Sequence, residues 1–316
     1  MKFKIDGFVL SIIAVTADSL FPIDTISAIG ISLIFFFYGL KLSPQKLKAG
    51  LKNWKLHLLV QASTFLIFPL IVLTFYPLMQ NEEQETLWLA FFFLAALPST
   101  VSSSVVMVAM AKGNIPAAIF NASISGIIGI VLTPIWMGLF VQNTQADFDF
   151  TEIYTKLLLQ ILVPVFLGLL LQRFLGVLAQ KYSSQLSLFD KSIILLIIYK
   201  SFAESFEAKI FGSVSLLDLV MLFIGVLALF FLVFFSTGIT AKKLKFNLED
   251  QITAQFCGTK KSLVHGTVFS KILFGKMASI GIILLPLMIY HASQILIMSI
   301  IAGKLARRKA VGEGSI

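Results

Sequence analysis

The sequence predicts an all-α integral membrane protein with ten transmembrane helices, arranged as two inverted five-helix repeats in which the fourth and ninth helices are broken. Three observations predict this fold class. Of the 316 residues, 58% are hydrophobic and only 13% are charged, whereas soluble domains carry about 25% charged residues. The chain divides into ten apolar runs, and a membrane-spanning helix needs about 20 such residues. Polar clusters interrupt the fourth and the ninth runs.

The predicted spans follow the apolar runs in chain order. They are Ile5–Leu20, Ile26–Leu40, Leu56–Met79, Leu87–Ala111, Ile115–Val141, Ile153–Leu175, Ser192–Phe206, Leu216–Ile239, Ile252–Leu273 and Met277–Gly303. The first run resembles a signal peptide, but no small-residue cleavage site precedes Asp18 and more spans follow, so we expect a retained helix. Pro44 opens a basic segment that predicts a short helix outside the membrane.

The positions of the charges predict the topology. Lys and Arg are concentrated at 41–55, at Lys112, at 173–191, at 242–245 and in the tail, whereas acidic residues fill the alternate loops. Cytoplasmic loops are enriched in Lys and Arg, so we expect a multi-pass protein of the cell inner (plasma) membrane with both termini in the cytoplasm. This arrangement explains the net charge of +9 without nucleic acid as a partner. Segment 41–55 is also a candidate contact for anionic membrane lipids.

Two halves of the chain have the same organisation. Residues 1–145 hold five spans and residues 150–316 hold five more, followed by a basic tail, within one integral membrane unit. Because five is odd, the second half enters the membrane from the opposite side. Inverted repeats of this kind are typical of secondary transporters, in which the binding site lies between the repeats near the bilayer midplane.

The first polar cluster interrupts the fourth span after Pro98. Proline has no backbone N–H and disfavours helix in the residue before it, so it can open the helix. The hydroxyl side chains that follow can cap the new helix start or bond freed carbonyls; they are Ser99, Thr100, Ser102, Ser103 and Ser104. A half-helix N-terminus attracts an anion, and unwound carbonyls hold a cation. The alternative is a Ser-rich packing face, and the same choice applies to Asn121 and Ser125 in the fifth span.

The second polar cluster interrupts the ninth span and contains two adjacent lysines. The candidate site residues are Cys257, Thr259, Lys260, Lys261, Ser262 and His265. A lysine at the centre of a membrane helix costs about 2.5–3.5 kcal/mol on insertion scales, so the pair predicts an anionic substrate or a proton carrier. The alternative is that both lysines reach a membrane surface. His265 is a candidate relay or a packing residue, and Tyr290, His291 and Gln294 are candidates for site wall or interhelical contact.

Enzyme motifs are missing from the sequence. It contains no His-Glu metalloprotease motif and no Gly-x-Ser-x-Gly elbow, which are the patterns of metalloproteases and of α/β-hydrolases. Cys257 and His265 stand eight positions apart, about two helical turns, too far for a nucleophile–base hydrogen bond in a continuous helix. We therefore expect no enzyme, no catalytic residue, no metal and no cofactor, with Na⁺ or H⁺ as candidate coupling ions.

Several motifs support a resemblance to a known family. They are Leu97–Met107, Gly113–Ala118, Asn121–Ser125, Leu132–Pro134, Val163–Gly168, Phe256–Ser262 and Leu285–His291. On these motifs the chain resembles the bile acid:sodium symporter (SBF) family, in the SBF-like branch related to the seventh member of human solute carrier family 10. The resemblance runs nearly end to end. It implies ten helices in two inverted repeats, with broken fourth and ninth helices that cross at the centre and a mobile panel that moves against a core.

The sequence departs from this family where sodium binds. In sodium-coupled members the ninth-helix crossing carries a Glu and a Gln that help to bind two sodium ions, and these positions fall near Cys257 and Lys261. A fourth-helix Ser-Asn pair corresponds to Ser104-Val105, and a Ser and a Thr of the fifth helix correspond to Ala118 and Ala122. A hard cation needs oxygen ligands. We hypothesise that Lys260 or Lys261 supplies the charge that sodium supplies elsewhere, and the resemblance does not extend to sodium coupling or to bile acids.

Two functional hypotheses remain. The first is a secondary transporter of a small organic anion that works by alternating access, coupled to protons or acting by facilitated diffusion, with Ser102–Ser104, Asn121, Thr259–Ser262 and His265 lining the crossing. The second is a membrane regulatory or scaffold protein that keeps the transporter fold without transport. A channel is less favoured, because the sequence shows no ring of like charges and no repeated filter.

Overall fold

The structure is a computed structural model, and it describes residues 22–42, 53–100, 102–141, 150–207, 216–275, 277 and 279–307. Within these ranges the regular secondary structure is helical throughout, as the sequence predicts. The predicted first span, most of the basic segment at 41–55, most of the acidic loop before Glu152 and the end of the basic tail lie outside the described residues.

The helices follow the predicted second to tenth spans. In chain order they are α2 (Ile23–Lys41), α4 (Trp54–Ala62), η1 (Ser63–Ile67), α5 (Phe68–Leu73), η2 (Tyr76–Leu78), α6 (Glu82–Ala96), α7 (Ser102–Met110), α8 (Ile115–Val141), α9 (Phe150–Leu157), η3 (Leu158–Leu162), α10 (Val163–Lys181), α11 (Ser183–Glu207), α12 (Leu216–Lys243), α13 (Leu248–Thr259), α14 (Leu263–Phe274) and α15 (Ile280–Ala306). The largest difference is in α11, which begins at Ser183 rather than at Ser192. Its polar first turns extend beyond the apolar run that the prediction used.

Two prolines explain the π-helical turns within long helices. Pro69 follows η1 and Pro164 follows η3, and in each case the residue before the proline donates its N–H to the carbonyl five positions back. A proline removes one donor from the helical ladder, and a π-turn shifts the register locally. The carbonyls around such a turn then need partners from other elements, and the Trp136 indole N–H supplies one to Phe65 O at 2.9 Å.

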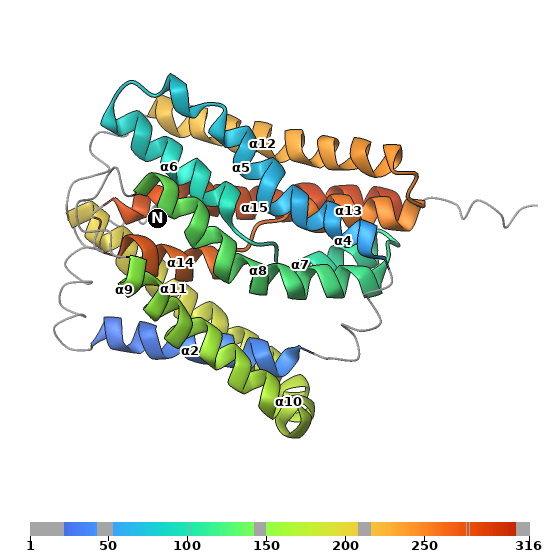
Figure 1. Cartoon of the computed structure of the whole chain (residues 1–316), viewed down its shortest axis with the longest axis horizontal. Helices are drawn as coiled ribbons and strands as arrows, with labels where there is room; N and C mark the ends of the chain where they lie inside the picture. The colour runs from blue at the N-terminus through green and yellow to red at the C-terminus, as the bar shows by residue number, and fades with distance from the viewer. Residues whose placement is uncertain are drawn as a thin grey trace, which may run out of the picture.

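Helices α2 and α10 pack against each other along one edge of the molecule, at the bottom of Figure 1, and α11 packs on α2 as well as on α14 and α15. Glycines allow α2 and α10 to touch backbone to backbone. A Cβ at Gly39 would lie 2.3 Å from Val165 O, and one at Gly168 would lie 2.2 Å from Phe36 O. Small residues permit such close approach between membrane helices, so α2 and α10 pack as one unit.

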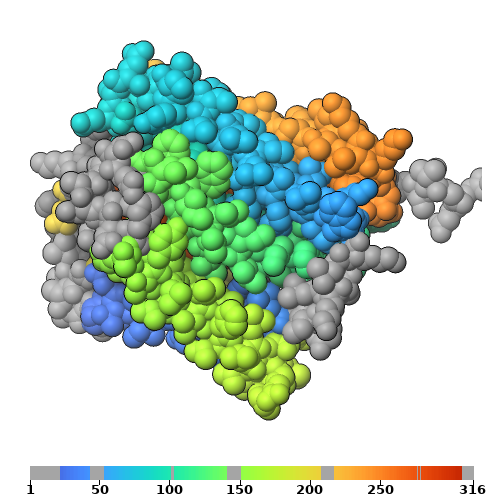
Figure 2. Space-filling model, viewed as in Figure 1, coloured from blue at the N-terminus to red at the C-terminus, as the bar shows by residue number. Residues whose placement is uncertain are grey.

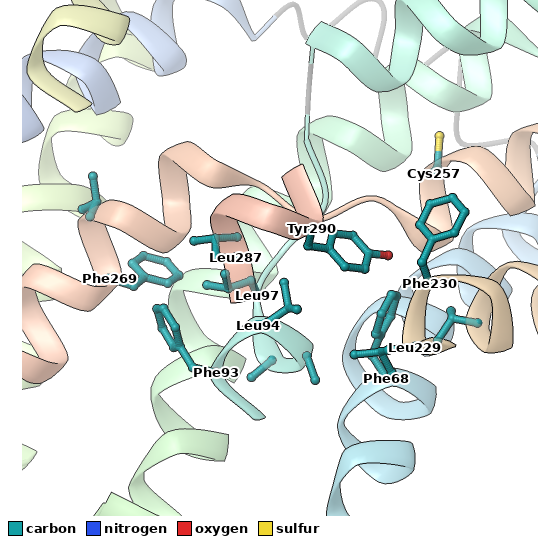
Figure 3. Close-up of a cluster of buried hydrophobic side chains, with 14 of the residues drawn as sticks. Phe68, Phe93, Leu94, Leu97, Leu229, Phe230, Cys257, Phe269, Leu287 and Tyr290 are labelled. Carbon is teal, nitrogen blue, oxygen red and sulfur yellow. The ribbon is translucent and has the colours of Figure 1, made fainter. Parts of the chain in front are cut away.

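The remaining helices surround a core rich in aromatic rings. Trp88 of α6 stacks on Phe92 with ring centroids 4.8 Å apart, and its indole N–H donates to Val72 O at 2.9 Å. Deeper in the molecule, the buried ring of Tyr290 lies between Phe68 and Phe230 on one side and Leu97 on the other (Figure 3). Little of α14 and α15 is visible on the face shown in Figure 2, so both helices lie behind other elements there.

The surface fits a membrane. Within the described ranges, six helices are long and apolar enough to cross a bilayer. The two broken helices fall short of that length because each is divided, and α11 is not among the six. Large apolar side chains point outward from α10 and α12, such as Val177, which is 82% exposed, and Leu217, which is 69% exposed. An apolar surface this extensive indicates contact with lipid, and the chain is a multi-pass membrane protein.

Candidate substrate and ion site at two helix breaks

The first break separates α6 from α7. Helix α6 ends at Ala96, because Pro98 has no backbone N–H to continue the helical ladder. Side chains of α8 replace the missing partners: the Thr133 hydroxyl donates to Ala96 O at 2.7 Å, and Ser99 N–H donates to Ser125 Oγ at 2.9 Å. Backbone groups at membrane depth need such partners. The sequence prediction that Pro98 opens this helix is therefore confirmed.

The second break separates α13 from α14 at Lys260–Ser262. Lys260 has an extended backbone with φ −75° and ψ 145°. Ser262 caps α14, since its Oγ accepts a hydrogen bond from His265 N–H at 3.3 Å. Serine is a favoured residue at a helix start because its oxygen satisfies one of the unpaired N–H groups there. The ninth span is thus broken at the two lysines.

Helix α15 holds the second break in place. The Gln294 side chain accepts from Lys261 N–H at 2.9 Å and donates to Lys261 O at 2.8 Å. The Tyr290 hydroxyl donates to Thr259 O at 2.6 Å. Both side chains are fully buried. The sequence leaves two roles open for Tyr290 and Gln294, site wall or interhelical contact, and the structure shows interhelical hydrogen bonds.

The two breaks are hydrogen-bonded to each other. The Ser99 hydroxyl donates to Cys257 O at 2.8 Å, and Ser262 N–H donates to Pro98 O at 2.9 Å. Residues more than 150 positions apart in the sequence therefore meet in the interior. This junction brings together most of the predicted site residues from both halves of the chain.

The remaining hydroxyls of the first break bond to one another. Thr100 Oγ1 lies 2.8 Å from Ser103 Oγ and 2.9 Å from Ser104 Oγ, and Thr100 and Ser104 are buried. Ser102 begins α7, and its side chain lies outside the described residues. Hydroxyls that satisfy each other in this way can exchange donor and acceptor roles, so they could also turn toward a ligand.

The two lysines have different surroundings. Both are fully buried, with 0% exposure, which excludes the alternative that they reach a membrane surface. Lys261 Nζ donates to three backbone carbonyls, those of Thr64, Ala95 and Leu97, at 2.8, 2.6 and 2.8 Å. Within the described part of the chain, Lys260 Nζ has no hydrogen-bond partner. The sequence gives no sign of this difference.

Lys260 shares its surroundings with polar groups that are also unsatisfied or only partly satisfied. Cys257, three residues before it near the end of α13, is also fully buried. Thr259 Oγ1 is buried and has no hydrogen-bond partner among the described residues. Buried polar groups are normally paired. An unpaired ammonium and an unpaired hydroxyl on adjacent residues at a helix break therefore indicate a position for a ligand.

His265 lies among aromatic rings beside the second break. Its Nδ1 is 2.9 Å from Ser262 Oγ, and its ring meets those of Phe35, Tyr38 and Phe269 edge-on, with centroids 5.3, 6.0 and 5.8 Å apart. Nε2 is buried without a partner in the residues that the structure describes. His265 therefore packs as a core residue while it keeps one nitrogen unpaired.

Asn121 bonds to the third span rather than to the first break. Its Nδ2 donates to Ala117 O at 3.0 Å, and its Oδ1 accepts from Gln61 Nε2 at 3.2 Å. Of the two predicted residues of the fifth span, only Ser125 contacts the break directly.

Sequence reasoning missed the contribution of the third span. Thr64 supplies a carbonyl to Lys261, and the Phe68 ring lies 4.1 Å from Lys261 Nζ. The available signal was Phe68-Pro69 within an apolar run, because a proline inside a helix frees carbonyls. Among the described residues, no three His, Cys, Asp or Glu side chains come together to hold a metal ion.

Comparisons with known proteins find one matching family and several relatives. The model of the SBF-like CPA transporter family matches residues 9–307. The chain is 34% identical to YfeH of Escherichia coli K12, whose name proposes a symporter, over 96% of this chain and 94% of YfeH. It is 35% identical to the uncharacterised protein PA2026 of Pseudomonas aeruginosa, over 98% and 95% of the two chains. It is 32% identical to sodium/bile acid cotransporter 7 of Danio rerio, over 92% of this chain and 86% of that protein.

Proposed function

Because the chain belongs to the SBF-like CPA transporter family, we propose that it is a secondary transporter of a small organic anion, and that Lys260 binds the anionic group. The observation that supports this proposal is the Lys260 ammonium, which is 0% exposed and has no partner among the described residues. A buried lysine is costly and marks a functional site unless it is paired. An anionic substrate would supply the missing partner.

The two lysines differ in how many of their N–H donors are free, and this difference indicates which charged group the substrate carries. Lys261 has all three N–H donors occupied by carbonyls, so it has none left for a substrate. Lys260 has its donors available, and the unpaired hydroxyl of Thr259 is adjacent. A carboxylate, sulfate or sulfonate offers several acceptor oxygens that suit this pair of donors. The rest of the substrate would face the apolar core, which favours an organic anion over an inorganic one. Bile acid in the names of relatives is one example of this class.

Alternating access and the ten-helix inverted repeat are part of the proposal. Support comes from the two breaks, which fall in the fourth span of each half and bond to each other. Further support comes from α2, η3 and α10, which pack mainly on one another. That group can move as a panel against the helices that carry the breaks. Such a motion would open the junction to one side of the membrane at a time.

We also propose an orientation in the cell inner (plasma) membrane with both termini in the cytoplasm. Basic residues stand in the last turns of α2, α10, α12 and α15, and acidic residues stand in the first turns of α2, α6 and α12. The ends of α2 and α12 that carry lysine point to the same side in Figure 1. Lys and Arg mark the cytoplasmic side, and lipids surround the apolar outer faces.

Thermal unfolding of the purified protein tests the anion site. Benzoate, phenyl sulfate and taurocholate serve as probes, with neutral benzamide as the matched control ligand. A ligand that binds only the folded state raises the apparent stability by mass action. We expect at least one anion, and not benzamide, to raise the unfolding temperature of the natural protein and to enter proteoliposomes.

Two variants identify the lysine responsible. Lys260→Met keeps the length of the side chain and removes its charge, and it should abolish both the anion response and uptake. Lys242→Met changes an exposed lysine at the end of α12 and should keep both. A response that survives in Lys260→Met would contradict the assignment. A natural protein that ignores every anion and tolerates polar substitutions at the breaks would instead support the regulatory or scaffold hypothesis.

A further inference from the structure

The ammonium group of Lys261 is bound as a cation would be bound in a site made of carbonyl oxygens. Its three oxygen partners are Thr64 O at 2.8 Å, Ala95 O at 2.6 Å and Leu97 O at 2.8 Å. A lysine ammonium has three N–H donors and no acceptor, so three carbonyls use its full capacity. The face of Phe68 lies 4.1 Å away and adds a cation–π contact. Every close partner of Nζ is therefore one that a cation favours.

The carbonyl of Thr64 is available because of Pro69. In a regular α-helix the N–H of Phe68 would donate to Thr64 O, but in the π-turn it donates to Ser63 O. The next residue in the π register is Pro69, which has no N–H. Thr64 O therefore has no donor within its own helix in either register. Thr64 O would therefore lack an intrahelical hydrogen-bond donor even if residue 261 were not a lysine.

The carbonyls of Ala95 and Leu97 are available because α6 ends. The C-terminal turn of a helix has carbonyls without intrahelical partners and carries partial negative charge. The neighbouring oxygens are already satisfied: Ala96 O accepts from Thr133, and Pro98 O accepts from Ser262 N–H. The oxygens at Ala95 and Leu97 accept instead from Lys261 Nζ. Together with Thr64 O they define one cation position.

We propose that Lys261 is a tethered cation that fills a monovalent-cation site built by the backbone, so that the protein needs no Na⁺ or K⁺ there. Removing the side chain should convert this position into a site for a free monovalent cation. The proposal concerns cation binding at the breaks and does not depend on the proposed anion transport. If transport does occur, the consequence is that no free cation enters or leaves at this position during the cycle, because its occupant is covalently attached.

Thermal unfolding in NaCl, KCl and choline chloride at equal ionic strength tests the proposal. The natural protein should unfold at the same temperature in all three salts. Lys261→Ala should unfold at a lower temperature in choline, and Na⁺ or K⁺ should raise that temperature in a saturable way. n-Propylammonium, which has the three carbons and the ammonium that the truncation removes, should also raise it. Choline is too large for the carbonyl site and should not.

Lys260→Ala is the matched control. It truncates the adjacent buried lysine, whose Nζ donates to no backbone carbonyl among the described residues. It should gain no response that distinguishes Na⁺ or K⁺ from choline. If Lys261→Ala is not recovered as folded protein in choline, purification in Na⁺ or K⁺ throughout should recover it. Lys261→Gln, which keeps the side-chain bulk, should then show the same cation dependence in a milder form.

Two results would overturn the proposal. One is a natural protein that Na⁺ or K⁺ stabilises over choline, because the site would then accept free cations beside Lys261. The other is Lys261→Ala or Lys261→Gln that folds equally well in all salts and gains no stability from any small cation. Neither result depends on the anion experiments, so failure of the tethered-cation proposal and failure of the proposed transport function can be told apart.

Discussion

Replacing Gln294 by Met should loosen the second helix break. The Gln294 amide accepts a hydrogen bond from the N–H of Lys261 at 2.9 Å and donates one to its C=O at 2.8 Å. Methionine has similar length and flexibility, so the change removes two hydrogen bonds with little change in volume. Lys261 then loses the backbone anchor that positions its side chain beneath the three carbonyls.

The size of the effect depends on which reference state applies. In soluble proteins an unsatisfied buried group costs about 1–3 kcal/mol, so two groups would cost about 2–6 kcal/mol. In membranes, interhelical hydrogen bonds average about 0.6 kcal/mol with a maximum near 1.7, because the unfolded chain also finds partners. The junction is fully buried in lipid-embedded protein, so the membrane values apply. We expect a loss of about 1–3 kcal/mol.

Thermal unfolding in detergent or in lipid discs measures this loss. A change of 1 kcal/mol shifts the unfolding temperature by about 2–4 °C in chains of roughly 150–250 residues, so Gln294→Met should unfold several degrees below the natural protein. Gln180→Met makes the same chemical change at an exposed position of α10 and should have no comparable effect. Equal unfolding temperatures for the two variants would refute the role of Gln294 as the anchor of the break.

Three further substitutions test other contacts. Gly39→Ala should lower the unfolding temperature, because its Cβ would lie 2.3 Å from a backbone oxygen and overpacking costs about 1–3 kcal/mol or more. The control Gly303→Ala should leave the unfolding temperature unchanged, because its Cβ would meet no atom within 4 Å. Thr133→Val removes the donor to Ala96 O and should cost about 0.6–1.7 kcal/mol, measured by denaturant or thermal unfolding. Asp24→Asn removes ion pairs to two lysines; since Asp24 is 62% exposed, we expect a loss of about 0–1 kcal/mol that disappears at high salt.

The sequence predicts the breaks well because their causes are local. Pro98 removes a backbone donor wherever it stands in a helix, and the hydroxyl residues after it suit a helix start. The apolar run of the fifth span gives the bounds of α8, Ile115–Val141, without error. Helix ends that are polar, such as the start of α11 at Ser183, are not visible to a search for apolar runs.

The different roles of the two lysines are not visible in the sequence, for two physical reasons. First, the oxygens that bind Lys261 belong to the backbone of Thr64, Ala95 and Leu97, and every residue has such an oxygen, so residue identity carries no signal. Second, which carbonyls lack a partner depends on the register of a distant helix. The hypothesis that one of the two lysines supplies a cation's charge therefore cannot choose between them from the sequence, and it stays a prediction.

The break itself explains how adjacent lysines come to face different surroundings. On a helix, neighbouring side chains diverge by about 100°, whereas along an extended backbone successive side chains point to opposite sides. Lys260 and Ser262 both have extended backbones, with ψ of 145° and 114°. Lys261 points toward the carbonyls at the end of α6, whereas Lys260 Nζ has no hydrogen-bond partner among the described residues. In our two proposals the same break supplies one lysine for a cation position and leaves a second for an anion, and a continuous α13–α14 helix would provide neither arrangement.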